Sequence, residues 1–316
     1  MTREFLEDLR TEVAEGPRPR QMLVTLMAEY WVELGARAPS GALVELMEEF
    51  GVPGSGTRTL LSRICRRGRL EQHREGRRTF YSFADGARGR VLQGFNSMAR
   101  FGRVPGPDPF IWTTVVFSVP EAQRPRRLKL HKGLSWMGFA PLYDGVWVSP
   151  QAAREGVAGL LRSLEIDAAT VFEATAHGVG RTHGLPTDAW SVPLIRSRYE
   201  AFLDQVEEAL AAVDSGRVTA AEALVLRTQL INVWRWFPRM DPGLPLDLLP
   251  ADWPRQRAAA CFRKLYAKLE PLAVSFVRAV VERHSAEHLD DVRSHRIPEQ
   301  VPEVITVSGV PAYQRY

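Results

Sequence analysis

The N-terminal part of the chain holds the feature that most restricts its fold, a run of three short helical patterns followed by two strand patterns. Apolar residues recur at helical spacing in residues 21–32, 40–50 and 55–67, and tight turns separate these segments. Residues 69–73 and 78–83 alternate as strands do, on either side of a polar turn that contains glycine. Together the five segments predict a small helical module that carries a β-hairpin.

The same part of the chain is strongly basic. Residues 54–90 contain ten arginines and three acidic residues, a net charge of +7, although the whole chain carries only +4. A compact basic segment in an otherwise slightly acidic chain is typical of a module that binds a polyanion, whereas a solvated basic surface is the alternative that charge alone leaves open. Three helices followed by a basic hairpin is the element order of a winged helix-turn-helix. The sequence therefore predicts double-stranded DNA as the partner.

The third helical pattern, residues 57–67, has an apolar side that is expected to pack inward and a polar side that faces outward. Arginine can pair with two acceptor atoms of guanine, and small hydroxyls can reach base edges or phosphates. Arg58 and Ser62 are therefore expected to contact bases, whereas the arginines of the hairpin can reach phosphates or a minor groove. The expected DNA-contacting residues are Ser55, Arg58, Thr59, Ser62, Arg63, Arg66, Arg74, Arg77 and Arg78.

A stretch rich in glycine and proline at residues 102–109 predicts a domain boundary. Beyond it, strand and helical patterns alternate up to about residue 175, and the pattern is then helical from about 190 to 284. The predicted fold class is α+β multidomain, with an N-terminal winged helix-turn-helix, a middle ferredoxin-like α+β domain and a mainly helical C-terminal domain. The expected ranges are a flexible tail at 1–16, the DNA-binding domain at 17–97, the middle domain at 98–176, the helical domain at 177–295 and a tail at 296–316.

Composition and motifs argue against several classes of protein. The chain has no run of about 18 apolar residues, and its first ten residues lack the apolar stretch of a signal peptide, so we expect a cytoplasmic protein without a membrane partner. Cys65 and Cys261 have no metal-ligand spacing, which favours reduced packing residues. Residues 51–56 complete no phosphate-binding motif, and His177 and His183 have no standard ligand partners. We expect no cofactor, no metal, no catalytic residue and hence no enzyme.

Several motifs are shared with a known family of regulators. Residues 57–63 (TRTLLSR), 66–70 (RRGRL) and 75–78 (EGRR) resemble the DNA-binding domain of the PaaX family, repressors of aerobic phenylacetate catabolism. Residues 136–150 resemble the signature of its middle domain, and residues 234–254 resemble that of its C-terminal domain. The resemblance implies a repressor of phenylacetate or related aromatic catabolism genes that binds a partly palindromic operator as a homodimer. It also implies release by an aryl-CoA thioester, typically phenylacetyl-CoA, with other acyl-CoA esters as the alternative.

The resemblance also leaves other functions open. The middle domain of the family is similar in fold to small CRISPR-associated endoribonucleases, so the main alternative is a metal-dependent enzyme that processes nucleic acid. Here Ser118 stands where an acidic residue is usual in both groups, which removes a potential metal ligand. Arg255 stands where glycine is usual, and this puts the local turn in doubt. A third alternative is an RNA- or protein-binding adaptor.

The helical pattern at residues 223–237 carries the candidate effector site, in a C-terminal domain that the resemblance links to effector binding. Arg227 flanks an apolar face beside Trp234. A partly buried arginine needs an anionic partner, because an unpaired buried charge is costly. That partner is either an acidic residue of the protein or a phosphate of a bound CoA ester, and the sequence leaves both open. The expected effector-binding residues are Arg227, Trp234 and Arg235, although simple solvation is the alternative for Arg235.

Overall fold

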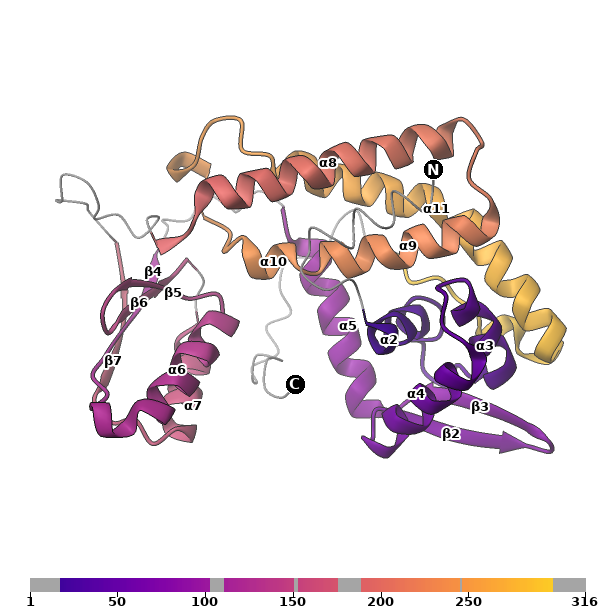
Figure 1. The fold of residues 1–316 in the computed structure, drawn as a ribbon, viewed down its shortest axis with the longest axis horizontal. Coiled ribbons are helices and arrows are strands. Elements are labelled where there is room, and N and C mark those ends of the chain that lie inside the picture. The colour runs from indigo at the N-terminus through magenta and orange to yellow at the C-terminus, as the bar shows by residue number, and fades with distance from the viewer. Residues whose placement is uncertain (1–17, 103–110, 151–152, 176–188, 245, 298–316) are drawn as a thin grey trace. The chain divides into compact units, whose positions relative to one another are not determined.

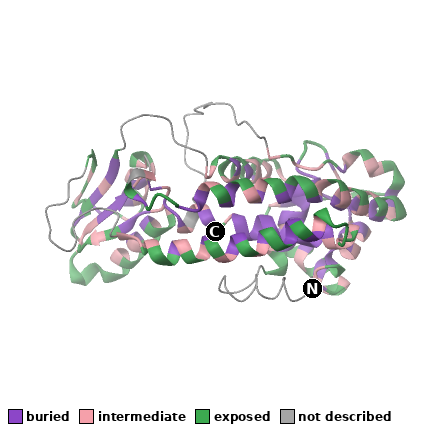
Figure 2. Ribbon diagram, turned by 90° about the horizontal axis from the view of Figure 1, so that it is seen from above, coloured by how far each residue is buried: buried purple, intermediate pink, exposed green. Residues whose placement is uncertain are grey.

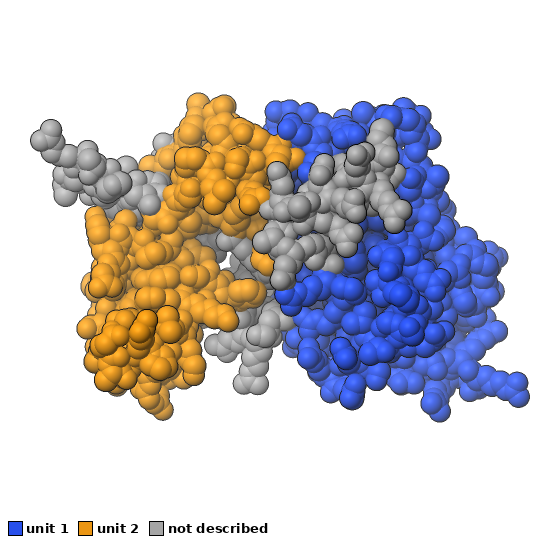
Figure 3. Space-filling model, in the orientation of Figure 1, with its two compact units in different colours: residues 1–100, 202–235, 257–301 blue, residues 101–201, 236–256, 302–316 orange. Residues whose placement is uncertain are grey.

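The computed structural model describes residues 18–102, 111–150, 153–175, 189–244 and 246–297 of the 316-residue chain (Figure 1). The chain divides into two compact units, each described here as far as these ranges reach (Figure 3). Unit 1 comprises Met1–Arg100, Phe202–Arg235 and Arg257–Val301, and unit 2 comprises Phe101–Ala201, Trp236–Gln256 and Pro302–Tyr316. Within the described ranges, no helix is long and apolar enough to cross a membrane.

Unit 1 begins with three helices and a hairpin. The helices are α2 (Pro19–Tyr30), α3 (Ser40–Glu48) and α4 (Gly54–Arg66), and the strands are β1 (Ala38–Pro39), β2 (Leu70–Glu75) and β3 (Arg78–Phe83). The strands form an antiparallel sheet in the order β1-β3-β2. Gly76 lies in the hairpin turn with a φ of 59°, a left-handed conformation that glycine adopts without steric cost. These elements therefore occur where the sequence patterns predict them.

The central helix of unit 1 is α9 (Ala220–Trp234), in which every residue from Ala223 onward is buried. Figure 2 shows such buried runs along the long helices in purple. The helix begins at a capping box, because the Thr219 hydroxyl accepts a bond from the Glu222 N–H while the Glu222 carboxylate accepts one from the Thr219 N–H. A helix buried on all sides needs partners all round, and α9 finds them in segments that are distant in sequence.

Trp234, at the end of α9, shows which segments these are. Its indole stacks on Phe262 of α11 (Arg255–Ser285) at 4.7 Å and lies 5.4 Å from Phe202 of α8 (Val192–Asp214). Its Nε1 donates to the carbonyl oxygen of Met98 in α5 (Asp85–Arg100) at 3.3 Å. The helix α2 also packs against α9. The C-terminal helices and the N-terminal module thus share one core.

The helical pattern that extends to residue 237 in the sequence ends earlier in the structure. The helix α9 ends at Trp234, and a separate short helix α10 (Phe237–Met240) follows. Pro238 explains the break, because proline has no N–H to donate and its ring would clash with the carbonyl of Trp234 in a continuous helix.

Unit 2 contains a four-stranded antiparallel sheet. In chain order its elements are β4 (Trp112–Phe117), the short η1 (Glu121–Gln123), α6 (Arg124–Trp136), β5 (Ala140–Tyr143), β6 (Val146–Ser149), α7 (Arg154–Ser163) and β7 (Ala169–Ala174). The strand order is β5-β6-β4-β7, so this βαββαβ arrangement is ferredoxin-like. Leu130 and Leu134 of α6 and Val157 of α7 pack with Val115 and Trp147 of the sheet. Both helices therefore cover the same face.

The other face of this sheet carries apolar side chains at the surface. Val115 and Phe117 point into the core, so Val116 between them points to the opposite face, where it is 38% exposed. Phe172 of β7 lies opposite Thr114 and is 51% exposed. Cross-strand partners share a face, so Val116 and Phe172 belong to one apolar surface. We call this surface the outer sheet face.

Arg255, the departure from the family pattern, has a structural role. It is 5% exposed, and its Nε and one terminal nitrogen donate to the two carboxylate oxygens of Asp241, each at 2.7 Å. Its other terminal nitrogen donates to the carbonyl oxygen of Leu244 at 2.8 Å, and the Tyr199 hydroxyl donates to Asp241 at 2.6 Å. The start of α11 is therefore tied to the segment after α10, which a glycine could not do. Residues Leu246–Leu248 of that segment form the short η3.

Candidate nucleic-acid interface

The helix α4 has a buried apolar side and an exposed polar side, as the sequence pattern predicts. Thr57, Leu61 and Ile64 are buried, while Leu60 and Cys65 are partly buried. Six polar residues are exposed, and all six are expected DNA contacts: Ser55, Arg58, Thr59, Ser62, Arg63 and Arg66. The Thr59 hydroxyl donates to the Ser55 carbonyl oxygen at 3.0 Å, which fixes its side chain on the helix surface. The outward side of α4 therefore presents three guanidinium groups and three hydroxyls.

The hairpin presents the other three expected contacts. Arg74, Arg77 and Arg78 are all exposed at the end of β2 and the start of β3. The strand β2 packs against α4, so the basic hairpin and the polar side of α4 belong to one module (Figure 1). Long cationic side chains on a hairpin can reach phosphates on a duplex that lies against the helix.

The hairpin also forms ion pairs with other parts of unit 1. Arg78 forms an ion pair with Glu287 in η4 (Ala286–Asp291), and both side chains are 56% exposed. Glu75 forms an ion pair with Arg37 and lies 3.6 Å from the His288 Nε2. One of the expected phosphate contacts is therefore already shared with a carboxylate of the protein.

Two further contacts join this C-terminal segment to the helices of the module. Glu45 of α3 pairs with Arg283 and with His284, whose Nε2 lies 2.7 Å from the carboxylate. Burial acts to raise the pKa of Glu45, but hydrogen bonds from Arg283 and His284 hold it below its usual range. The Arg37 N–H donates to Asp291 at 3.1 Å. Residues 283–296 thus hold the module at α3, at β1 and at the hairpin, and we call them the C-terminal strap.

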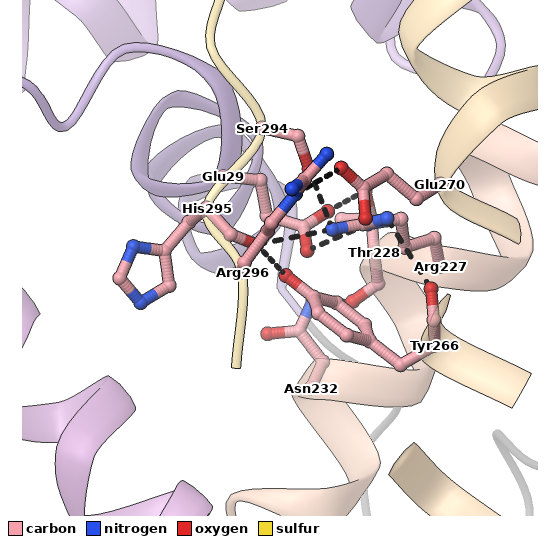
Figure 4. Close-up of polar contacts among 9 residues, drawn as sticks. All are labelled: Glu29, Arg227, Thr228, Asn232, Tyr266, Glu270, Ser294, His295 and Arg296. Atoms are coloured by element: carbon pink, nitrogen blue, oxygen red, sulfur yellow. Dashed lines mark hydrogen bonds and ion pairs between the residues drawn. The ribbon is translucent and has the colours of Figure 1, made fainter. Parts of the chain in front are cut away.

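Arg227 lies at the centre of a buried polar network (Figure 4). It is fully buried, and its Nε lies 3.4 Å from the carboxylate of Glu29, which is fully buried as well. Its terminal nitrogens donate to the Tyr266 carbonyl oxygen at 3.2 Å, the Ser294 hydroxyl at 2.8 Å and the His295 carbonyl oxygen at 3.1 Å. The guanidinium also lies 3.8 Å from the centre of the Tyr266 ring. Of the two partners that the sequence left open, the structure shows the internal carboxylate.

The network joins parts of the chain that no sequence pattern links to one another. Burial raises the pKa of Glu29 above its usual value, while the charge of Arg227 opposes that shift. The strap closes the site through its backbone, because the N–H groups of Arg293 and His295 donate to the carbonyl oxygens of Tyr30 and Glu29. Glu29 and His295 carry no motif, and only the need of a buried arginine for an anion could have pointed to an acidic residue in a buried helix face.

The other two expected effector contacts differ in exposure. Trp234 is fully buried, whereas Arg235, the residue that ends α9, is partly buried. The helices around Trp234 enclose a cavity of only about 10 Å³, lined by Phe202, Val206 and Leu230 among others. Such a space holds one water molecule at most. This cavity is therefore too small for a CoA ester.

A larger cavity of about 320 Å³ opens on unit 2. It is lined by His131 of α6, by Trp147 of β6 and by the β5–β6 turn, residues 141–145. Among the described residues, no group of three or more His, Cys, Asp or Glu side chains is placed to hold a metal ion. His177 and His183 lie outside the described residues.

Family descriptions match three successive parts of the chain. "PaaX-like protein" matches residues 18–87, "PaaX protein central Cas2-like domain" matches 110–185 and "PaaX-like protein C-terminal domain" matches 190–279. The chain belongs to the PaaX family. The Cas2-like domain of this PaaX-family protein contains the ferredoxin-like sheet of unit 2, and the C-terminal domain contains α8, α9 and most of α11.

Two individual proteins are similar to this PaaX-family chain. The transcriptional repressor PaaX of Escherichia coli strain K12 is 27% identical over 243 residues, which cover 75% of this chain and 76% of that protein. The solved structure of the uncharacterised protein Rv0674 from Mycobacterium tuberculosis matches with a TM-score of 0.52 and 20% identity, over 86% of this chain and 99% of that one. The second likeness concerns the fold alone. The first relative is a repressor, which is consistent with a regulator that is not an enzyme.

Proposed function

We propose that this PaaX-family protein is a repressor that reads double-stranded DNA with α4 in the major groove and with the β2–β3 hairpin as a wing on the backbone or minor groove. The observation that carries this proposal is the separation of α4 into a buried apolar side and an outward side of arginines and hydroxyls, beside a hairpin with three exposed arginines. This arrangement supports a winged helix-turn-helix that has its proposed contact residues at the surface.

The experiment is a binding titration of the full chain against the DNA upstream of its own gene and against a random duplex of equal length. Tighter binding to the upstream DNA, with an affinity that falls as salt rises, is the expected result. Adding Mg²⁺ should leave the DNA intact. Metal-dependent cleavage would instead support the nuclease, for which Ser118 at the end of β4 offers no acidic ligand.

We propose in addition that the repressor controls phenylacetate or related aromatic catabolism genes in the cytoplasm. An aryl-CoA thioester, phenylacetyl-CoA first among candidates, is its effector and releases it from DNA. The family membership supports this proposal. Arg227 and Trp234 are fully buried in the described conformation, so a CoA ester reaches them only after a rearrangement, and partly buried Arg235 is the more accessible of the three. A network that joins α2 to α9 and the strap is well placed to respond to such a rearrangement.

Titrating the protein bound to DNA with phenylacetyl-CoA, free CoA and phenylacetate tests the effector. An affinity for DNA that falls about 100-fold requires the effector to prefer the released state by about 2.7 kcal/mol. Phenylacetyl-CoA should act and phenylacetate should not, because phenylacetate lacks the phosphates that arginines recognise. Release by phenylacetate alone would contradict the proposal.

The protein is further proposed to act as a homodimer through the outer sheet face. The support for this is the exposure of Val116 and Phe172 on a sheet whose helices cover only the opposite face. An apolar sheet face is stable in water when something covers it. A second copy of the same face would do so symmetrically, as in most homodimers, and two α4 helices would then meet two half-sites of one operator.

A further inference from the structure

The cavity on unit 2 has the size and walls of a ligand site. Its volume of about 320 Å³ falls in the usual range for small-molecule pockets, whereas the cavity beside α9 is about thirty times smaller. Trp147 forms an apolar wall, and the partly buried His131 ring lies 5.0 Å from the Trp147 ring and 5.8 Å from that of Phe117. Tyr143, 57% exposed, adds a third ring to the lining. Flat aromatic walls favour a flat aromatic guest.

The polar groups of the cavity restrict that guest further. Asp144, in the β5–β6 turn, is the one charged residue among those that line the cavity, and a carboxylate accepts hydrogen bonds from an amine. Burial, and then the charge of Arg127, lower the pKa of His131, whereas Asp144 acts to raise it. A neutral imidazole both donates and accepts hydrogen bonds. The cavity therefore suits an aromatic ring that carries an N–H donor and a ring nitrogen.

Positive charge lies directly beside this cavity. The helix α6 that supplies His131 contains five basic residues and no acidic one: Arg124, Arg126, Arg127, Lys129 and Lys132. Arg127 precedes His131 by one turn and so lies on the same side of the helix. Its guanidinium donates to Glu121 at 2.7 Å, and its side chain is 32% exposed, so further donors can meet a ligand. Phosphates that a sugar joins to the ring would lie within reach of this group.

We infer that the cavity formed by His131, the β5–β6 turn and Trp147 binds the adenine nucleotide portion of a ligand, with Arg127 on its phosphates. The shared chemistry is an adenine ring joined through a ribose to phosphates, which a CoA ester and a free adenine nucleotide both contain. For a CoA ester the inference rests on the proposed effector and gives it a site in the Cas2-like domain. The acyl end of CoA lies far from its phosphates, so it is the adenine end that matches a ring pocket beside an arginine.

The test is calorimetric titration of the full chain with ADP, CoA, phenylacetyl-CoA and phenylacetate. The three nucleotide compounds should bind and phenylacetate should not. Inosine diphosphate, which has a carbonyl in place of the adenine amine, should bind more weakly than ADP. Failure of ADP and CoA to bind, or equal affinities for ADP and inosine diphosphate, would overturn the adenine site.

Three variants locate the site. Arg127→Gln should weaken ADP and CoA by about tenfold or more, since it removes a hydrogen bond between charged groups. Tyr143→Ala should weaken both by a similar factor through lost stacking, and its side chain is exposed enough to be removed without leaving a buried hole. Lys129→Gln is the matched control, because it removes the same charge from the opposite side of α6 and should leave both affinities unchanged. An equal loss of affinity for ADP and CoA in Arg127→Gln and Lys129→Gln would show a general electrostatic attraction to α6 and would exclude a specific site.

The experiments test the adenine site and the acyl-CoA effector separately. Release of DNA by phenylacetyl-CoA with equal potency in wild type, Arg127→Gln and Tyr143→Ala would show that the effector does not use the cavity, and would leave the effector itself standing. ADP and CoA could instead bind wild type and fail to bind Arg127→Gln, while no acyl-CoA releases the DNA. That result would support the cavity and contradict the proposed effector. ADP that binds alone, with CoA and its ester excluded, would identify a free nucleotide as the source.

Discussion

Arg227 is the residue at which four segments of unit 1 meet: α2 through Glu29, α9 through its own backbone, α11 through Tyr266 and the strap through Ser294 and His295. The side chains of Arg227 and Glu29 are both fully buried. A buried pair of this kind adds little net stability over apolar residues of the same size, but breaking it leaves a charge uncompensated. The network is therefore sensitive to the loss of one member.

Replacing Glu29 by Gln should lower the free energy of unfolding by about 3–5 kcal/mol, because the Arg227 charge stays buried without its carboxylate. Urea denaturation of the two proteins measures this difference. Glu33→Gln, at an exposed glutamate four residues later in the chain, is the control and should change stability little. A loss of less than 1 kcal/mol for Glu29→Gln would contradict the role assigned to the pair.

Arg58 and Arg77 should differ in what they contribute to DNA binding. Arg58→Ala should cost about 1–3 kcal/mol at one operator position, because a base contact is lost, whereas Arg77→Ala should weaken all sequences alike through a lost phosphate contact. Affinities for the operator, for single-position operator variants and for random DNA separate the two effects. Equal losses on operator and random DNA for Arg58→Ala would remove it from the base-reading residues.

His295 should make stability depend on pH. Burial, and then the charge of Arg227, hold its pKa below the usual value near 6.5, while Glu33 acts in the opposite direction. As pH falls through about 6.5, the unfolded chain binds a proton before the folded chain does, so the free energy of unfolding decreases with falling pH. Urea unfolding at pH 7.5 and pH 5.5 should show this decrease, and His295→Gln should show less of it. An unchanged pH dependence in the variant would exclude His295 as its source.

At the scale of elements, the hairpin that is proposed to contact DNA also forms ion pairs with the rest of unit 1. Arg78 pairs with Glu287, and Glu75 meets Arg37 and His288. Because both partners are more than half exposed, the Arg78–Glu287 pair is worth at most about 1 kcal/mol, less than a phosphate contact can supply. If Arg78 contacts a phosphate as proposed, Glu287 competes with the DNA backbone for it.

Glu287→Gln should tighten DNA binding by up to about fivefold, since it frees Arg78 for a phosphate. Gel-shift or fluorescence titration at fixed salt measures the change, and the gain should vanish when Arg78 is replaced by Ala as well. Glu282→Gln, an exposed acid on α11, removes the same charge and controls for general attraction. Weaker binding by Glu287→Gln would show that the pair serves to position the wing.

Local sequence patterns are enough to predict α2, α3, α4 and the hairpin. Each of these elements has its own apolar stripe, its own turn residue or its own alternation of apolar and polar residues. The end of α9 was misplaced, since Pro238 is a stronger signal than the apolar run across it. The role of Arg255 and the partner of Arg227 could not be read from the chain. Arg227 and Glu29 are 198 residues apart, and only the assembled core brings them together. The outward side of α4 was predictable because it depends on helical spacing alone.

At the scale of the whole molecule, the outer sheet face should decide the oligomeric state. Phe172→Glu places a charge on the outer sheet face and should convert a dimer into a monomer at micromolar concentration, because a buried unpaired charge is costly. Leu128→Glu, at an exposed leucine on α6, is the matched control and should leave the dimer intact. Sedimentation velocity distinguishes the two. A Phe172→Glu protein that stays dimeric would place the interface elsewhere.

The interleaved chain of unit 1 has a consequence for how the protein is made. Carbonyl groups of Glu29 and Tyr30 are bonded by the backbone of residues 293 and 295, and Glu29 also awaits Arg227. At a translation rate of about 5–20 residues per second, the N-terminal module leaves the ribosome about 10–50 s before the strap that completes it. During that interval α2 lacks its contacts with the strap and, until α9 has been synthesised, its contacts with α9. The contacts of the N-terminal module are complete only after residues 283–296 have been synthesised. A ribosome that stalls before this segment would therefore release an N-terminal module without the contacts of the strap.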